Sequence, residues 1–304
     1  MRKIYLLFII PFFLVQGCEK KTPRLSAARI ASGNNMGNYF AYANSIAPIL
    51  GEKMGIDVSV LSTAASMANI ALLEEGRAEF AFVQNDVMTY AHNGTNLFSH
   101  LGPQNRFAAV AGLYDEVCHI VASEEIKEAA ELKGRRVSIG EEGSGTALNA
   151  AQILETFGFA AGDIIESRYG FSDSARLFAA GEIDAFFCTA GAPVPAVRSL
   201  ADSMRINIIP FGEARSRLLT SNYPYYTPAK ILAGVYEGVN ETNVIAVKAV
   251  LVARADIAEE DVYEVTKNII ENISTLNAES AVQGIPVPFH KGALRYYREQ
   301  NVIK

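Results

Sequence analysis

Short apolar runs alternate with amphipathic stretches along the chain after residue 26. The first half holds apolar runs at 28–32, 57–61 and 79–83, and helical apolar spacing at 38–54, at 67–75 and after residue 86. This alternation is typical of an α/β fold with a largely parallel sheet. The pattern therefore predicts three strand–turn–helix units in the first part of the chain.

The same pattern starts again after a long apolar stretch at 108–123, which only Asp115 and Glu116 interrupt. Strands are predicted at 136–139, 164–169 and 183–188, helices at 147–157, 174–180, 259–276 and 291–300, and a second extended segment at 244–253. Two such units joined by extended segments favour two lobes with strands that cross between them, and a ligand crevice between the lobes. We place lobe I at residues 27–120 plus 245–304 and lobe II at residues 121–244.

The first residues indicate export. Arg2 and Lys3 precede an apolar run at 4–15 that ends at Gly17-Cys18. This run is shorter than the roughly 18 residues that a membrane span needs, so residues 1–17 are predicted to be a signal peptide with a lipoprotein cleavage box. Cys18 would carry the lipid, residues 18–26 would form the tether, and the membrane would be contacted only through the lipid. Ordinary cleaved secretion and a retained anchor are the alternatives.

Charge and composition narrow the function. Removal of residues 1–17 leaves 25 basic and 33 acidic residues, a net charge of −8, which argues against nucleic acid as a partner. The four histidines show no metal-ligand spacing, and neither a metal nor a cofactor is expected. Cys118 and Cys188 are interpreted as buried thiols, although an exported protein could pair them. We expect a monomer.

Small polar residues gather at the carboxyl ends of the predicted strands, where open α/β sheets bind ligands. Each of these turns leads into a helix N-terminus, whose free N–H groups attract carboxylates or phosphates, although the same residue types also cap helices. Two tyrosines, Tyr39 and Tyr114, are expected to face the crevice. The candidate residues in these turns are Asn34, Ser66, Asn69, Gln84 and Asp86 in the first half, and Gly143, Ser144, Gly145, Thr146, Tyr169 and Ser172 in the second.

The turn Gly143-Ser144-Gly145-Thr146 is the most specific of these motifs. It lacks the lysine of a phosphate-binding P-loop, and Glu142 stands where a nucleophile elbow has its first glycine. A secreted hydrolase that uses Ser144 is one alternative, but no catalytic residue is assigned and we do not expect an enzyme. If the ligand carries an amino group, Asp86 is the predicted partner. Apart from Arg168, these turns hold no Arg or Lys, so neutral donors and helix ends would hold an anion.

Several segments together resemble the solute receptors of tripartite ATP-independent periplasmic (TRAP) transporters, specifically the TAXI family. The matching segments are Ser62-Thr63 with Ser66 and Asn69, Gln84-Asn85-Asp86-Val87, Ala111-Gly112-Leu113-Tyr114, residues 132–137, Gly143-Ser144-Gly145-Thr146, residues 181–187, Ala190-Gly191-Ala192-Pro193 and residues 290–297. The resemblance implies a type II periplasmic-binding-protein fold that closes on a ligand and docks on a sodium-driven permease.

The resemblance also implies a ligand class and a set of binding residues. A carboxylate, such as a dicarboxylate or glutamate, would be captured and delivered to a TRAP-type permease from a periplasmic or cell-surface position. Ala64-Ala65 and the first loop, Asn34-Asn35-Met36-Gly37, depart from the family pattern, which leaves the identity of the ligand open. A ligand-sensing lipoprotein that signals to a membrane protein is the alternative function. The binding role would pass to Asn34, Ser66, Asn69, Gln84, Asp86, Ser144, Thr146 and Gly191.

Overall fold

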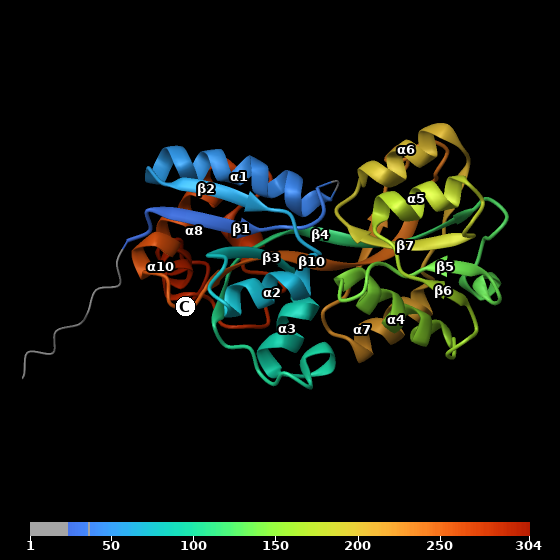
Figure 1. Cartoon of the computed structure of the whole chain (residues 1–304), viewed down its shortest axis with the longest axis horizontal. Coiled ribbons are helices and arrows are strands. Elements are labelled where there is room, and N and C mark those ends of the chain that lie inside the picture. Colours follow the sequence, from blue (N-terminus) through green and yellow to red (C-terminus); the bar gives the residue numbers. More distant parts are fainter. Residues whose placement is uncertain (1–23, 36) are drawn as a thin grey trace, which may run out of the picture.

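Two long strands run through both halves of the molecule and join them. The computed structural model describes residues 24–35 and 37–304. Strands β4 (Phe107–Ser123) and β10 (Thr242–Arg254) lie side by side at the centre of the mixed sheet, whose order is β2-β1-β3-β10-β4-β7-β5-β6. Figure 1 shows one lobe at each end of this strand pair. The predicted two-lobe fold with crossing strands is therefore confirmed. The exact lobe boundaries stay a prediction, and we keep the names lobe I and lobe II for the ranges given above.

Lobe I is built from strand–helix units on both sides of its part of the sheet. Its strands pair in parallel, β1 with β2 and with β3. The elements are β1 (Ala27–Ala31), α1 (Asn38–Met54), β2 (Asp57–Leu61), α2 (Ser66–Glu74), β3 (Phe80–Gln84), α3 (Asn85–Asn93), the 3-10 turn Asn96–Phe98, α8 (Glu259–Asn272), α9 (Ala278–Ala281) and α10 (Lys291–Glu299).

Lobe II repeats this construction at the other end of the crossing strands. Parallel pairs join β5 to β6 and to β7. The elements are the 3-10 turn Ala129–Leu132, β5 (Arg136–Ser138), α4 (Gly145–Phe157), β6 (Ile165–Ser167), α5 (Phe171–Ala179), β7 (Ala185–Ala190), α6 (Pro195–Ser203), β8 (Ile206–Ile208), α7 (Glu213–Asn222) and β9 (Thr227–Ile231).

The expectation of a largely parallel sheet is correct within each lobe and wrong at the centre. β10 pairs antiparallel with β3, β4 and β9, and β4 pairs antiparallel with β7 and β8. The reason is that the chain crosses to lobe II along β4 and returns along β10, so these two strands must run in opposite directions. The sheet therefore belongs to both lobes and places the ends of their parallel strands opposite each other.

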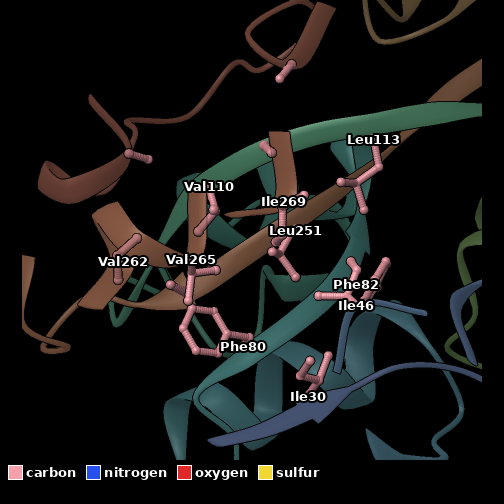
Figure 2. Close-up of a cluster of buried hydrophobic side chains, with 14 of the residues drawn as sticks. Ile30, Ile46, Phe80, Phe82, Val110, Leu113, Leu251, Val262, Val265 and Ile269 are labelled. Carbon is pink, nitrogen blue, oxygen red and sulfur yellow. The ribbon is translucent and has the colours of Figure 1, made fainter. Parts of the chain in front are cut away.

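Apolar side chains form a separate core on each side of the sheet in each lobe. In lobe I one of these cores packs Ile46 of α1 and Val265 of α8 against Phe80, Phe82 and Leu251 of the sheet (Figure 2). Burial of such side chains contributes roughly 1.5–3 kcal/mol each. Each lobe therefore has hydrophobic cores of its own.

The two cysteines of the lobes are free thiols on opposite faces of the sheet. In the register of β4 and β7, Cys118 lies opposite Thr189, and Cys188 lies opposite His119. Since successive strand residues point to opposite faces, the two thiols lie in different cores. The interpretation as buried thiols is confirmed. A disulfide between them is excluded because their side chains point to opposite faces of the sheet.

The N-terminal predictions lie mostly outside the described residues. The signal peptide at 1–17 and the lipidated Cys18 are not covered by the structure. At the end of the predicted tether, Arg24 pairs with Asp261, and the backbone N–H of Leu25 donates to the same carboxylate (2.8 Å). Over the described residues, no helix is both long and apolar enough to cross a membrane.

Candidate functional site

A cavity of about 70 Å³ lies between the lobes, next to the crossing strands. Both lobes contribute to its wall, and none of the described residues that line it is Lys or Arg. Lobe I provides Gly33, Asn34, Gly37, Asn38, Tyr39, Thr63, Ala64, Ala65, Ser66, Gln84 and Glu116, and lobe II provides Glu141, Ser144, Gly145, Thr146, Gly170, Phe171, Thr189 and Ala190.

Four helices begin at this cavity. The first residues of α1, α2, α4 and α5 are Asn38, Ser66, Gly145 and Phe171, and all four line it. The first N–H groups of a helix have no partner inside the helix and carry partial positive charge. These N–H groups would favour a negatively charged group in the cavity, although none of its described lining residues is Lys or Arg.

The lobe I wall contains a buried polar network around Glu116 of β4. The Tyr39 hydroxyl donates to Glu116 Oε2 (2.7 Å), and the backbone N–H of Gln84 donates to Ser66 Oγ (3.1 Å). The Gln84 side chain also hydrogen-bonds Glu116, and Ser66 hydrogen-bonds Tyr39. Burial raises the pKa of Glu116 to about 8. A proton therefore stays on this carboxyl at neutral pH unless a positive charge comes close.

The lobe II wall is made of a tight turn and hydroxyl groups. Ser144 caps α4, since its Oγ accepts from Ala147 N (3.1 Å) and donates to the carbonyl of Glu141 (2.6 Å). Thr146 Oγ1 accepts from the backbone N–H of Thr189 (3.3 Å), so its own hydroxyl proton is available to a ligand. Ser144 therefore acts as a helix cap, as its residue type alone would suggest, and it also lines the cavity.

The two lobes touch each other beside the cavity. A Cβ atom added to Gly145 would lie 1.9 Å from Gln84 Oε1, so the amide of lobe I rests on the first turn of a lobe II helix. Asn38 Nδ2 donates to the carbonyl of Gly191 across the gap (3.0 Å). These contacts close the cavity and show that the lobes are described in a closed arrangement.

Seven of the fourteen predicted binding residues line this cavity, namely Asn34, Tyr39, Ser66, Gln84, Ser144, Gly145 and Thr146. They come from turns that lie far apart in the sequence, and the crossing strands bring them together. Contact with a ligand stays a prediction for each of them.

Two predicted residues lie beside the cavity with structural partners. Asn69 joins neighbouring strand ends, since its Nδ2 donates to the carbonyls of Ser32 (2.6 Å) and Phe82 (2.7 Å). Asp86 lies in the first turn of α3 and accepts from Asn149 Nδ2 of α4 (2.7 Å). Burial raises the pKa of Asp86 to about 6. Asp86 therefore lies at the contact between α3 and α4. It does not line the cavity, where it was expected to bind an amino group of the ligand.

The other five predicted residues lie around the rim. Tyr114 and Gly191 line a neighbouring depression, which shares Asn38 with the cavity. A Cβ atom at Gly143 would lie 3.5 Å from Met67 Sδ. Tyr169 is 42% exposed, and Ser172 is exposed one residue after Phe171. Direct ligand contact by these residues stays a prediction.

The sequence reasoning missed Glu116 as a site residue. The signal was present, because two acids side by side in a strand must point to opposite faces. Asp115 points outward and pairs with Lys248 of β10 (3.0 Å), which leaves Glu116 inside. A group of three or more metal-binding side chains is absent from residues 24–35 and 37–304.

The closed lobes, the crossing strands and the polar cavity between them define the two-lobed fold of periplasmic solute-binding proteins. The sequence model of the NMT1-like family matches residues 30–300, and the chain belongs to this family.

Three solved structures with the same fold are distantly similar in sequence. A protein from Bordetella bronchiseptica RB50 is 18% identical, with 90% of this chain and 82% of that chain covered and a TM-score of 0.57. PhnD1 from Prochlorococcus marinus MIT 9301, in complex with methylphosphonate, is 12% identical, with 91% and 99% covered and a TM-score of 0.55. The alkanesulfonate-binding protein SsuA from Xanthomonas axonopodis pv. citri, bound to MOPS, is 13% identical, with 91% and 84% covered and a TM-score of 0.51.

Proposed function

We propose that this protein is an exported receptor that captures a small carboxylate between its lobes and delivers it to a membrane permease without chemical change. One observation carries the proposal: turns from both lobes direct four helix N-termini into one closed cavity without a cationic side chain among its described lining residues. Charge-assisted hydrogen bonds to such N–H groups contribute roughly 1.5–3 kcal/mol each.

The closed arrangement explains how binding would be signalled to a permease. A ligand that touches Gln84 and Thr146 at the same time stabilises the closed lobes over the open ones, and its differential affinity sets how far the balance shifts. Because the network consists of neutral donors and helix ends, the ligand can leave when a permease opens the lobes. Dicarboxylates and acidic amino acids such as glutamate are the first candidates.

The cavity offers little support for the hydrolase alternative. Ser144 Oγ is held by its capping bonds, and none of the four histidines lines the cavity. Ser144→Ala is expected to weaken ligand binding, with no turnover to lose.

A thermal-shift screen of the purified protein against carboxylates, amino acids, phosphonates and sulfonates tests the ligand class. A ligand at 100 times its dissociation constant adds about 2.7 kcal/mol to the free energy of unfolding. Stabilisation by at least one small carboxylate is expected. The absence of any shift with carboxylates, together with a shift by a phosphonate or sulfonate, would contradict the proposed class.

The permease is proposed to be of the TRAP type, on the basis of the sequence resemblance, and Cys18 is proposed to hold the receptor at the membrane by its lipid. Neighbouring genes test the transporter. A multi-span permease without an ATP-binding subunit supports this type, and an adjacent ATP-binding subunit contradicts it. An adjacent sensor kinase would instead favour the sensing alternative.

A further inference from the structure

Two carboxyl groups, the buried Glu116 and the partly buried Glu141, line the cavity where an anion receptor would be expected to have a cation. Glu116 is 3% exposed and lines the cavity from β4. The nearest cationic side chain on the crossing strands, Lys248, is paired with Asp115 (3.0 Å). When ionised, Glu116 would repel a second negative charge on a bound ligand, and none of the described residues that line the cavity is a Lys or Arg that could neutralise the pair.

A second acceptor lies beside this carboxyl group. Gln84 is 3% exposed, and its carbonyl oxygen Oε1 has no hydrogen-bond partner. Its amide hydrogen-bonds Glu116, and Oε1 lies against Gly145, another residue of the cavity wall. A buried acceptor without a donor is costly, at roughly 1–3 kcal/mol. The pair of Glu116 and Gln84 Oε1 is thus complementary to a donor with positive charge.

We propose that Glu116 and Gln84 Oε1 bind the ammonium group of an amino acid, and that the carboxylate of the same ligand faces the N-termini of α2 and α4. This inference rests on the proposed function and narrows its ligand class from small carboxylates in general to amino acids. An ammonium group has three N–H donors, which suits two acceptors held side by side. The role given to Asp86 by the sequence passes to Glu116.

Binding of an ammonium group is expected to change the protonation state of Glu116. The free carboxyl of Glu116 holds a proton below a pKa of about 8, and an adjacent ammonium favours its ionised form. Binding therefore releases one proton to solvent at pH 6.5. The titratable groups that interact with Glu116 are Tyr39 of α1, Asp86 of α3, Tyr114 and Cys118 of β4 and Cys188 of β7.

Matched ligand pairs test the inference in the purified protein by titration calorimetry. The pairs are glutamate with glutarate, aspartate with succinate, and alanine with propionate, which differ only in the ammonium group. At least one amino acid is expected to bind about 10- to 100-fold more tightly than its deaminated partner. Titration in two buffers of different ionisation enthalpy is expected to show about one proton released for the amino acid and none for the deaminated acid.

Three carboxyl-to-amide variants locate the ammonium site. Glu116→Gln keeps the shape and the hydrogen bond from Tyr39, and is expected to bring the two members of the pair within about threefold of each other. Asp86→Asn removes another buried carboxyl, which lies outside the cavity, and is expected to keep the preference. Loss of the preference in Asp86→Asn or in Glu141→Gln, with Glu116→Gln unaffected, would overturn the assignment.

The same binding measurements distinguish an amino-acid ligand from the more general proposal of a carboxylate receptor. Equal binding of both members of every pair, or tighter binding of the deaminated acid, overturns the inference and leaves a carboxylate receptor. Absence of binding by all six acids overturns the inference and removes the support for a carboxylate receptor as well. The wild-type comparison and the proton count require no variant, so a folding defect in Glu116→Gln would not decide the result.

Discussion

The two walls of the cavity use different chemistry. The lobe I wall has a continuous buried network of Glu116, Tyr39, Ser66 and Gln84, whereas the lobe II wall presents backbone N–H groups and the hydroxyl of Thr146. The lobe I wall therefore adds buried side-chain acceptors to its helix N-termini, whereas the lobe II wall combines helix N-termini and a hydroxyl with the carboxyl of Glu141. This difference fits the dipolar ligand that we propose, whose two ends would need both walls.

The largest effect is expected from a substitution that keeps the two walls apart. In Gly145→Ala, the new Cβ atom would meet the buried amide of Gln84 at 1.9 Å, so the lobes cannot close without moving that side chain. Affinity for the ligand is expected to fall about 100-fold, equivalent to roughly 3 kcal/mol, with little change in the melting temperature. Titration calorimetry and small-angle scattering would measure both effects.

Two further variants make this prediction specific. Gly212→Ala also changes a glycine before or at a helix start, but nothing lies within 4 Å of its Cβ position, so affinity should be unchanged. Adding Gln84→Ala to Gly145→Ala removes the clash and should restore closure in scattering with ligand present. Full affinity in the single Gly145→Ala variant would show that the lobes do not close on these residues.

Glu116 in the lobe I wall should make the free energy of unfolding depend on pH in the ligand-free protein. The pKa of Glu116 is raised from an ordinary value of 4.5 to about 8, so the folded state holds a proton that the unfolded state has lost. Stability from this group is complete below pH 4.5 and is lost as pH rises through 8. Between pH 6 and pH 8, the wild type should lose about 2 kcal/mol relative to Glu116→Gln.

Urea unfolding of both proteins at pH 6 and pH 8 measures this difference. Asp86, whose pKa is about 6, contributes in the same direction at lower pH and is present in both proteins. A constant difference between wild type and Glu116→Gln would mean that Glu116 ionises freely in the folded state.

The first turns of the two walls also differ in backbone strain. In lobe II, the positive φ of +72° belongs to a glycine, Gly143, whereas in lobe I a φ of 68° belongs to Ala65. A side chain in this region costs of order 1–3 kcal/mol. Ala65→Gly is therefore expected to raise the free energy of unfolding by about 1 kcal/mol, after the entropy that glycine adds to the unfolded chain.

Ala64→Gly is the matched control for Ala65→Gly, because Ala64 is the neighbouring residue and is not among those with positive φ. It should destabilise the protein by about 0.5–1 kcal/mol, the usual effect of glycine on the unfolded chain. Equal effects of the two variants in urea unfolding would show that Ala65 is not strained.

The smallest expected effect concerns the hydrogen bond across the gap. Asn38→Ala removes the bond to the carbonyl of Gly191, which should weaken ligand binding about 2- to 10-fold, since one such bond contributes about 0.5–1.5 kcal/mol. Asn44→Ala, on the same helix, removes only a bond to Phe40 within α1 and should leave affinity unchanged. A loss above about 100-fold in Asn38→Ala would place Asn38 in direct contact with the ligand.

The sequence predicted elements well wherever local pattern decides them. The predicted helix at 38–54 and the strand at 57–61 agree with α1 and β2, because apolar spacing and a closing glycine at residue 55 mark their ends. Residues 195–231, which form α6, β8, α7 and β9, had no clear alternation. The antiparallel centre of the sheet depends on the direction in which the chain returns, and local spacing carries no information about that.

The same limit applies to the site. Turns rich in glycine and hydroxyl residues identified Ser66, Gln84, Ser144 and Thr146, because strand ends in α/β sheets have predictable positions. Glu116 lies in the middle of a strand and becomes a cavity residue only through its contacts with Tyr39 and Gln84. Asp86 was expected at a turn, but it lies in the first turn of a helix that packs on Asn149.

The affinity of one ligand for two variants, one in each wall, tests whether both lobes contribute to a single binding site. Gln84→Ala and Thr146→Ala remove cavity side chains that belong to different lobes. A shared site predicts that each variant weakens the same ligand about 10-fold or more in titration calorimetry, with one ligand bound per chain. Weakening by only one of the two variants would contradict the shared site.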